Sequence, residues 1–96
     1  MMSDAVHPVP TAIDTHVHVW DTSGGPFGVR YGWLDSAAPL LRRSYPLAEL
    51  DPALDEAGID GVVLVQASDS LAETDELIRV AGEASRPARV TGWLPL

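Results

Sequence analysis

The chain has 96 residues, of which 46% are hydrophobic and 21% are charged, values typical of one small globular domain. Acidic residues outnumber basic ones 14 to 6, every basic residue is an arginine, and the formal net charge is −8. This charge opposes binding to nucleic acid and to anionic membrane surfaces, because both require clustered basic side chains. The sequence has no cysteine, which excludes disulfides, thiolate metal sites and cysteine nucleophiles.

The N-terminus lacks the basic segment and apolar stretch of a secretory signal. No apolar run approaches the roughly 18 residues of a membrane span. We therefore expect a cytoplasmic protein. Residues 1–11 contain Pro8 and Pro10 and are expected to form a flexible lead, with residues 12–96 forming the domain.

Residues 12–20 predict a β-strand, because β-branched side chains recur at alternate positions. Alternate side chains of a strand point to the same face. Asp14, His16, His18 and Trp20 are therefore expected on one face, and the four β-branched residues between and before them on the other. The first face carries an acid and two histidines in single file, which is unusual for a solvent face.

Residues 21–46 predict a long connection broken by several glycines and by Pro26. Connections of this length are commonly lids or binding loops. The segment also contains four aromatic residues, which could line a binding site or simply pack the loop onto the body of the protein. They are Phe27, Tyr31, Trp33 and Tyr45.

A helix in two pieces is expected next. Three leucines at spacings of three and four form an apolar stripe. Asp51 is a suitable N-cap with Pro52 at the first helical position, and Gly58 is a suitable stop. The leucines of the stripe are Leu47, Leu50 and Leu54.

The apolar run 62–67 predicts a strand covered on both faces, as in parallel sheets. Residues 68–70 predict a turn, and residues 71–84 an amphipathic helix. The buried face of that helix is expected to carry Leu77, Ile78 and Ala81, with Leu71 and Thr74 continuing the stripe. The outward face is expected to carry Glu73, Glu76 and Glu83.

Pro87 ends this helical pattern, and residues 90–94 predict a third strand. The resulting order of strands and helices is typical of right-handed βαβ units, and therefore of an α/β fold with a parallel sheet.

The two histidines of the first strand are candidates for a metal site. Side chains at i and i+2 on a strand project side by side, close enough to bind one divalent ion, and zinc is the commonest such ion in hydrolases. A catalytic zinc takes three protein ligands, however, and His7 in the N-terminal lead is a poor candidate for the third. Asp14 could orient a histidine, or it could cap a local backbone turn.

The segment Ile13-Asp14-Thr15-His16-Val17-His18-Val19-Trp20-Asp21 resembles the opening of the amidohydrolase-related family. The similarity is greatest to its lactonase-like branch of metal-dependent hydrolases with a TIM-barrel fold. Residues 31–34, 57–66 and 92–93 resemble later segments of the same family in the same order. The resemblance therefore extends over residues 12–96.

This resemblance implies a partial TIM (β/α)8 barrel, consisting of the first three parallel strands and the two helices between them. It implies that His16 and His18 are catalytic and bind a divalent metal, most commonly zinc. Some members of this branch work without a tightly held metal, and there the two histidines would polarise the substrate directly. Gln66, Trp20 and Arg30 would contact a small-molecule substrate, a lactone or a related carboxylate.

The pocket-lining role has a structural alternative at each of these positions. Gln66 could be a polar strand end that is hydrogen-bonded to a loop. Asp21, Trp20 and Arg30 could belong to the loop's own packing. These alternatives remain open at the level of the sequence.

A closed barrel takes at least about 200 residues, so the domain is expected to be incomplete. The family's later metal ligands and its general base are absent, and the isolated chain is expected to be inactive. A decarboxylase or hydratase of the same superfamily and a non-catalytic remnant are the alternatives. Successive crossovers put both helices on one side of the sheet. If Gln66 points into the barrel, Val62 and Leu64 are expected on the other side, where the chain could self-associate.

Overall fold

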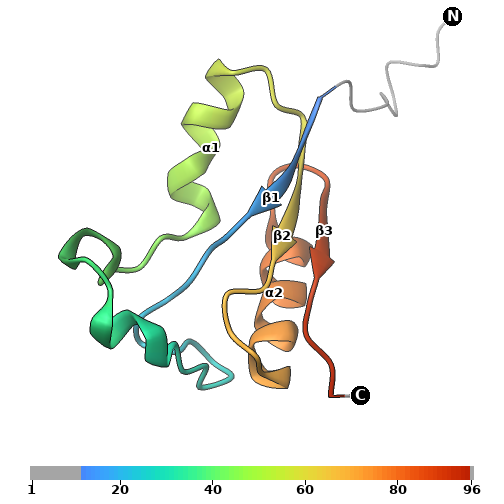
Figure 1. The fold of residues 1–96 in the computed structure, drawn as a ribbon. Coiled ribbons are helices and arrows are strands. Elements are labelled where there is room, and N and C mark those ends of the chain that lie inside the picture. The colour runs from blue at the N-terminus through green and yellow to red at the C-terminus, as the bar shows by residue number, and fades with distance from the viewer. Residues whose placement is uncertain (1–11, 96) are drawn as a thin grey trace, which may run out of the picture.

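The computed structural model describes residues 12–95. It contains a parallel sheet in the order β1-β2-β3, formed by β1 (Ile13–Val17), β2 (Gly61–Val65) and β3 (Ala88–Thr91). The helices α1 (Leu47–Glu56) and α2 (Leu71–Glu83) connect successive strands (Figure 1). The predicted α/β class, with three parallel strands and two intervening helices, is confirmed.

Two short 3-10 helices interrupt the long connection between β1 and α1. They are η2 (Gly32–Ser36) and η3 (Pro39–Leu41). Within the described part of the chain, neither these nor α1 and α2 are long and apolar enough to cross a membrane.

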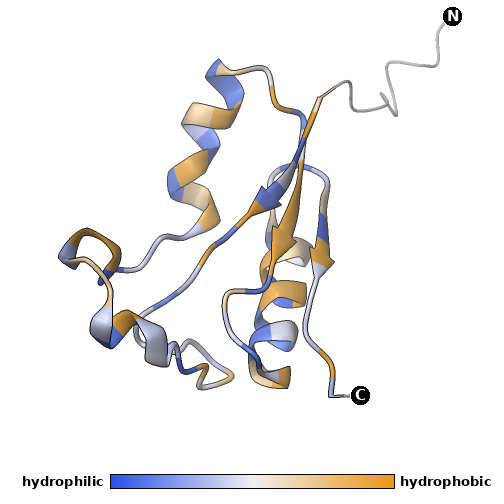
Figure 2. Cartoon of the chain, in the orientation of Figure 1, coloured by the Kyte–Doolittle hydropathy of each residue, from blue (hydrophilic) through white to orange (hydrophobic). Residues whose placement is uncertain are grey.

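Both helices cover the same face of the sheet. The main core lies between them and that face, and β2 is hydrophobic along its whole length (Figure 2). This cluster consists of Val17, Val19, Leu47, Leu54, Val62, Leu64 and Leu77.

Val62 and Leu64 were expected on the face away from the helices, and this prediction is wrong. They are 2% and 0% exposed and belong to the core under the helices. Alternation along β2 therefore puts Val63 and Val65 on the face that neither described helix covers. Ile13, which is 51% exposed, extends this face onto β1, where it pairs with Gly61.

A β-bulge interrupts the pairing of β1 with β2. Asp14 lies opposite Val62, but the next paired residue, Val17, lies opposite Leu64. β1 therefore advances three residues over a stretch in which β2 advances two. Because of the extra residue, Val17 lies on the same face as Asp14. The prediction that Asp14 shares a face with His16 is therefore wrong.

Helix α1 is continuous from Leu47 and does not begin at Asp51. Its N-cap is Pro46, and Pro52 lies inside the helix, where one backbone donor is lost. The leucine stripe is confirmed, because Leu47 and Leu54 are buried and Leu50 packs against the core.

Asp51 accepts hydrogen bonds from the Arg86 guanidinium instead of capping a helix. The predicted stop is confirmed, because α1 ends at Glu56 and Gly58 has a φ of +72°, a conformation that suits glycine.

The prediction for helix α2 is right in part, because Leu77 is buried and Ala81 packs against the core. Glu73 and Glu76 are buried at 0% and 7% exposure, whereas Leu71 and Ile78 are exposed at 49% and 57%. Both buried carboxylates have polar partners. Glu73 binds backbone amides of the preceding loop, and Glu76 binds the guanidinium of Arg79. Glu83 is exposed, as expected.

The bounds of β2 and β3 differ from the predicted ones by one to three residues. β2 ends at Val65 rather than at Ala67. The N–H of Gln66 still donates to Thr91 of β3, but the N–H of Ala67 donates to the side chain of Glu73 in α2. β3 begins at Ala88 and ends at Thr91. Trp93, which was expected in that strand, has its backbone N–H and C=O bound by the hydroxyl of Thr74.

We expect Gly92→Ala to destabilise the fold. A Cβ at Gly92 would lie 2.7 Å from Cγ2 and 2.8 Å from Oγ1 of Thr74, so the substitution should lower the free energy of unfolding by about 1–3 kcal/mol. Gly82→Ala is the matched control, because no atom lies within 4 Å of its new Cβ and alanine favours the helix by about 0.5–1 kcal/mol. Urea denaturation measures both, and equal losses would contradict the clash.

Candidate active site

Two histidines lie together where β1 ends. Nε2 of His16 is 3.1 Å from Nε2 of His18, and the ring centroids are 4.8 Å apart at an interplanar angle of 70°. Both side chains are exposed, whereas Val17 and Val19 beside them are buried under the helices. Beyond the bulge, the alternation predicted from the sequence therefore holds, and the histidines share the face that the helices leave uncovered.

A backbone carbonyl fixes the orientation of one of these rings. Nδ1 of His18 is 3.0 Å from the carbonyl oxygen of Val65, and a carbonyl oxygen only accepts. Nδ1 therefore carries a proton, and in the neutral ring Nε2 presents its lone pair. Metal-binding histidines commonly use their second nitrogen in this way. The short contact further implies that His16 donates its Nε2 proton to His18 when both rings are neutral.

Asp14 contacts the backbone rather than an imidazole. Its Oδ1 accepts a hydrogen bond of 3.0 Å from the N–H of His16. Of the two roles left open by the sequence, the contact observed is the local one, a cap on the turn of the bulge. The same bond restrains the backbone just before the two histidines.

A cavity of about 740 Å³ opens beside the histidine pair. It brings together four residues singled out from the sequence, which come from three separate segments: His18, Trp20, Arg30 and Gln66. His16 is not among the lining residues and reaches this space only through its contact with His18.

Two further walls complete the cavity, and the sequence reasoning missed the second of them. One is formed by Gly32 and Trp33 of the long connection, and the other by the β2–α2 loop, residues 67–70. The loop was treated as a plain turn. A serine N-cap directly after a strand end is the signal that could have identified it, because parallel strands deliver such loops to the mouth of a sheet.

The long connection packs on the body of the protein and also lines the cavity. Trp20 makes edge-to-face contacts with Trp33 and Tyr45, with centroid distances of 5.3 and 5.1 Å. Its indole N–H donates to the carbonyl of Arg43 at 2.8 Å. Both alternatives for these aromatics are therefore partly right.

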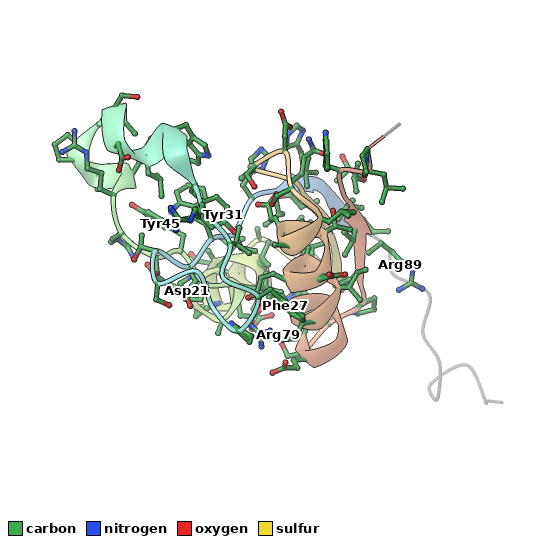
Figure 3. The ribbon with its side chains drawn as sticks, turned by 90° about the horizontal axis from the view of Figure 1, so that it is seen from below. Asp21, Phe27, Tyr31, Tyr45, Arg79 and Arg89 are labelled. Carbon is green, nitrogen blue, oxygen red and sulfur yellow. The ribbon has the colours of Figure 1, made fainter. Side chains whose placement is uncertain are left out.

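A second small core anchors the same connection. It consists of Val29, Tyr31 and Leu34, packed against Trp20, Ala67 and Ala72 among others. Figure 3 shows Tyr31 and Tyr45 on this connection, with Arg89 on β3 at the other end of the molecule. Burial, followed by the nearby Glu73 carboxylate, raises the pKa of Tyr31 above its ordinary value.

Arg30 and Gln66 differ in how they are held. The side-chain amide of Gln66 donates to Asp69 at 3.3 Å, and its backbone N–H donates to Thr91 at 2.9 Å. Gln66 is thus a strand end bonded to a loop that also borders the cavity. Arg30 is exposed and forms no hydrogen bond or ion pair with another residue of the range 12–95.

Asp21 lies outside this cavity. Its Oδ1 accepts hydrogen bonds from the hydroxyl and the backbone N–H of Ser23, at 2.7 and 2.8 Å. These bonds, that of the hydroxyl first, lower the pKa of Asp21 below its ordinary value. Its contacts are those of a turn-forming residue.

The histidine pair fits a zinc ion as part of a site. Two nitrogens on a tetrahedral zinc with bonds of about 2.0–2.1 Å lie about 3.3 Å apart, close to the 3.1 Å observed. Within residues 12–95, no group of three histidine, aspartate or glutamate side chains is arranged to hold a metal. His7 lies outside the described residues.

No family model matches the sequence. The chain is similar to L-fucono-1,5-lactonase of Burkholderia ambifaria, with 31% identity over 85 residues, and to L-fucono-1,5-lactonase of Burkholderia multivorans, with 30% identity over 81 residues. The alignments cover 88% and 84% of this chain but only 28% and 26% of those proteins. The chain thus spans little more than a quarter of the length of these relatives.

A solved structure agrees with these similarities. It is an amidohydrolase from Burkholderia multivorans with bound zinc, which superposes with a TM-score of 0.72 at 28% identity. The match covers 88% of this chain and 28% of that one. The parallel β/α order of this chain and these similarities support a likeness to the lactonase-like branch of the amidohydrolase-related family, over a part of that family's barrel.

Proposed function

We propose that His16 and His18 form part of a metal-assisted hydrolase site that acts on a lactone or a related carbonyl compound. The observation that carries this proposal is the pair of Nε2 atoms 3.1 Å apart at the end of β1, with His18 anchored on the carbonyl of Val65. In α/β barrels, active sites lie at the C-terminal ends of the strands.

The relatives support the reaction class. Both curated relatives are named lactonases, and the solved neighbour holds zinc. Two lactonases favour a hydrolase over a decarboxylase or hydratase. The proposed substrate is therefore a small molecule with an ester-like carbonyl.

The residues of this chain would divide the work as follows. Bound at the histidine pair, a divalent metal such as zinc would supply Lewis acidity toward the substrate carbonyl. His18 presents its Nε2 lone pair as it stands, and His16 would shift its proton from Nε2 to Nδ1 to do the same. Arg30 would contact an oxygen of the substrate, and Gln66 would border it. Trp20 would exclude water from one side.

The described residues would supply only part of the machinery. A catalytic zinc takes about three protein ligands, and two are available within residues 12–95. The proposal therefore requires a further ligand and a general base from elsewhere. We expect the 96-residue chain by itself to bind zinc weakly and to be inactive.

Zinc titration tests the histidine pair. We expect His16→Ala and His18→Ala each to weaken zinc binding by about tenfold or more, measured by calorimetry and by the fluorescence of the neighbouring tryptophans. His7→Ala is the matched control, because it removes the remaining histidine of the sequence and should leave the affinity unchanged. Equal affinities in the wild type and in both site variants would contradict the metal role.

We also propose that the chain self-associates through the face of the sheet opposite the helices. Parallel sheets are normally covered on both faces, and the described helices cover only one. On the other face Ile13 is 51% exposed and Val63 and Val65 are only partly buried. Covering these side chains would remove apolar surface from water.

Ile13→Lys should shift the chain toward the monomer. A lysine on this apolar face would place a charge inside the contact, where it loses its hydration, so the average mass measured by sedimentation equilibrium is expected to fall. Ile78→Lys is the control, because Ile78 is equally exposed at 57% but lies on α2. A mass that falls in the control and not in Ile13→Lys would assign the contact to the helical side.

A further inference from the structure

Glu73 is a buried carboxylate that the proposed chemistry does not use. It is 0% exposed and lies in the first turn of α2. Both of its oxygens accept the backbone N–H of Ala67 at 2.9 Å, and Oε1 also accepts that of Ser68 at 2.9 Å. Its own N–H donates to the hydroxyl of Ser70, the N-cap, at 3.1 Å.

This arrangement departs from an ordinary capping box. In that motif the glutamate three residues after the cap returns to the N–H of the cap residue itself. Here the carboxylate passes Ser70 and binds the amides of Ser68 and Ala67, two and three residues further back. It therefore shapes the whole β2–α2 loop, which is a wall of the cavity.

Ala67 is held from its other side by the opposite wall. Its carbonyl oxygen accepts the indole N–H of Trp33 at 2.7 Å. Trp33 borders the cavity and stands edge-on to Trp20. Residue 67 thus connects a carboxylate inside the protein to an aromatic ring at the cavity, through one N–H and one C=O.

Burying a carboxylate is costly unless its oxygens are hydrogen-bonded. Replacing a buried charge and its partner by apolar side chains of similar volume is often neutral or stabilising. If position 73 served packing alone, an apolar side chain would suit it. An apolar side chain has no directional bond with which to hold two amides, and this is what the carboxylate provides.

We propose that Glu73 is a positioning residue, which orients Ala67 and thereby sets the place of Trp33 in the wall of the cavity. This inference deepens the proposed function and rests on it for the meaning of the cavity. Its physical content, the control of Trp33 by Glu73, is independent of any ligand.

Nuclear magnetic resonance on the full chain, with neither zinc nor substrate, tests this directly. The indole N–H signal of Trp33 is identified by its loss in Trp33→Phe. We expect Glu73→Gln to shift that signal and to speed its hydrogen exchange by about tenfold or more, because the amide group offers one acceptor and an unmatched donor. The signals of the sheet amides report whether the fold is intact.

Glu76→Gln is the matched control. Glu76 is also a buried glutamate of α2, 7% exposed, but it binds the guanidinium of Arg79 rather than the loop. It should leave the Trp33 signal in place. An unmoved Trp33 signal in folded Glu73→Gln would overturn the proposal, as would an equal response in both variants.

If Glu73→Gln does not fold, amide hydrogen exchange of the wild-type protein tests the proposal instead. The proposal requires the amides of Ala67 and Ser68 to exchange as slowly as those of β2, and exchange at the rate of an open loop would overturn it. Failure of the zinc titration would remove the proposed chemistry and leave this result standing. Failure here would leave zinc binding by the histidines untouched.

Discussion

The C-terminal end of β2 is the point on which the rest of the site depends. Within three residues, four backbone groups bind four different partners. The carbonyl of Val65 holds His18, the N–H of Gln66 holds β3, and Ala67 is held by Glu73 on one side and by Trp33 on the other. If the sheet pairing had continued past Gln66, both backbone groups of Ala67 would be used within the sheet. The early end of β2 thus allows His18, the β2–α2 loop and Trp33 to meet at one place.

The bulge in β1 is the second constraint, and it explains why the histidine pair and the core coexist. Without the extra residue, register with β2 would put the histidines, rather than Val17 and Val19, on the face under the helices. Asp14 stabilises the bulge by binding the N–H of His16. Asp14 therefore holds the backbone of this segment in place, and in the proposed function the chemistry belongs to the imidazoles of His16 and His18.

The sequence predicted the order of elements, and which residues lie around one cavity, better than it predicted which way side chains face. The leucine stripe of α1 and the stop at Gly58 follow from local rules, because neighbouring turns of a helix share a face and a glycine tolerates positive φ. Gln66 and Arg30 were associated with His18 because the family resemblance supplied the connection. Local spacing alone contains no such information.

Two of the wrong assignments have a common cause, which is a charged side chain whose partner lies outside its own helix. Periodicity assigns glutamates to the solvent face, yet Glu73 finds its amides in the preceding loop. Asp51 has the composition of an N-cap, but Arg86, 35 residues away and with only 9% of its side chain exposed, takes it as an ion-pair partner. Such pairs are set by tertiary packing, and a single sequence gives no sign of them.

In the proposed function, the sheet face that the described helices leave uncovered and the need for a further metal ligand are connected. His16 and His18 point away from the helices, to the side on which Val63 and Val65 are only partly buried. Any group that completes the coordination of a metal there must approach across that face, and it must bring apolar surface with it to cover the valines. The same protein surface would therefore close the core and complete the site. This is the arrangement expected of a barrel interior, where packing and chemistry use opposite ends of the same strands.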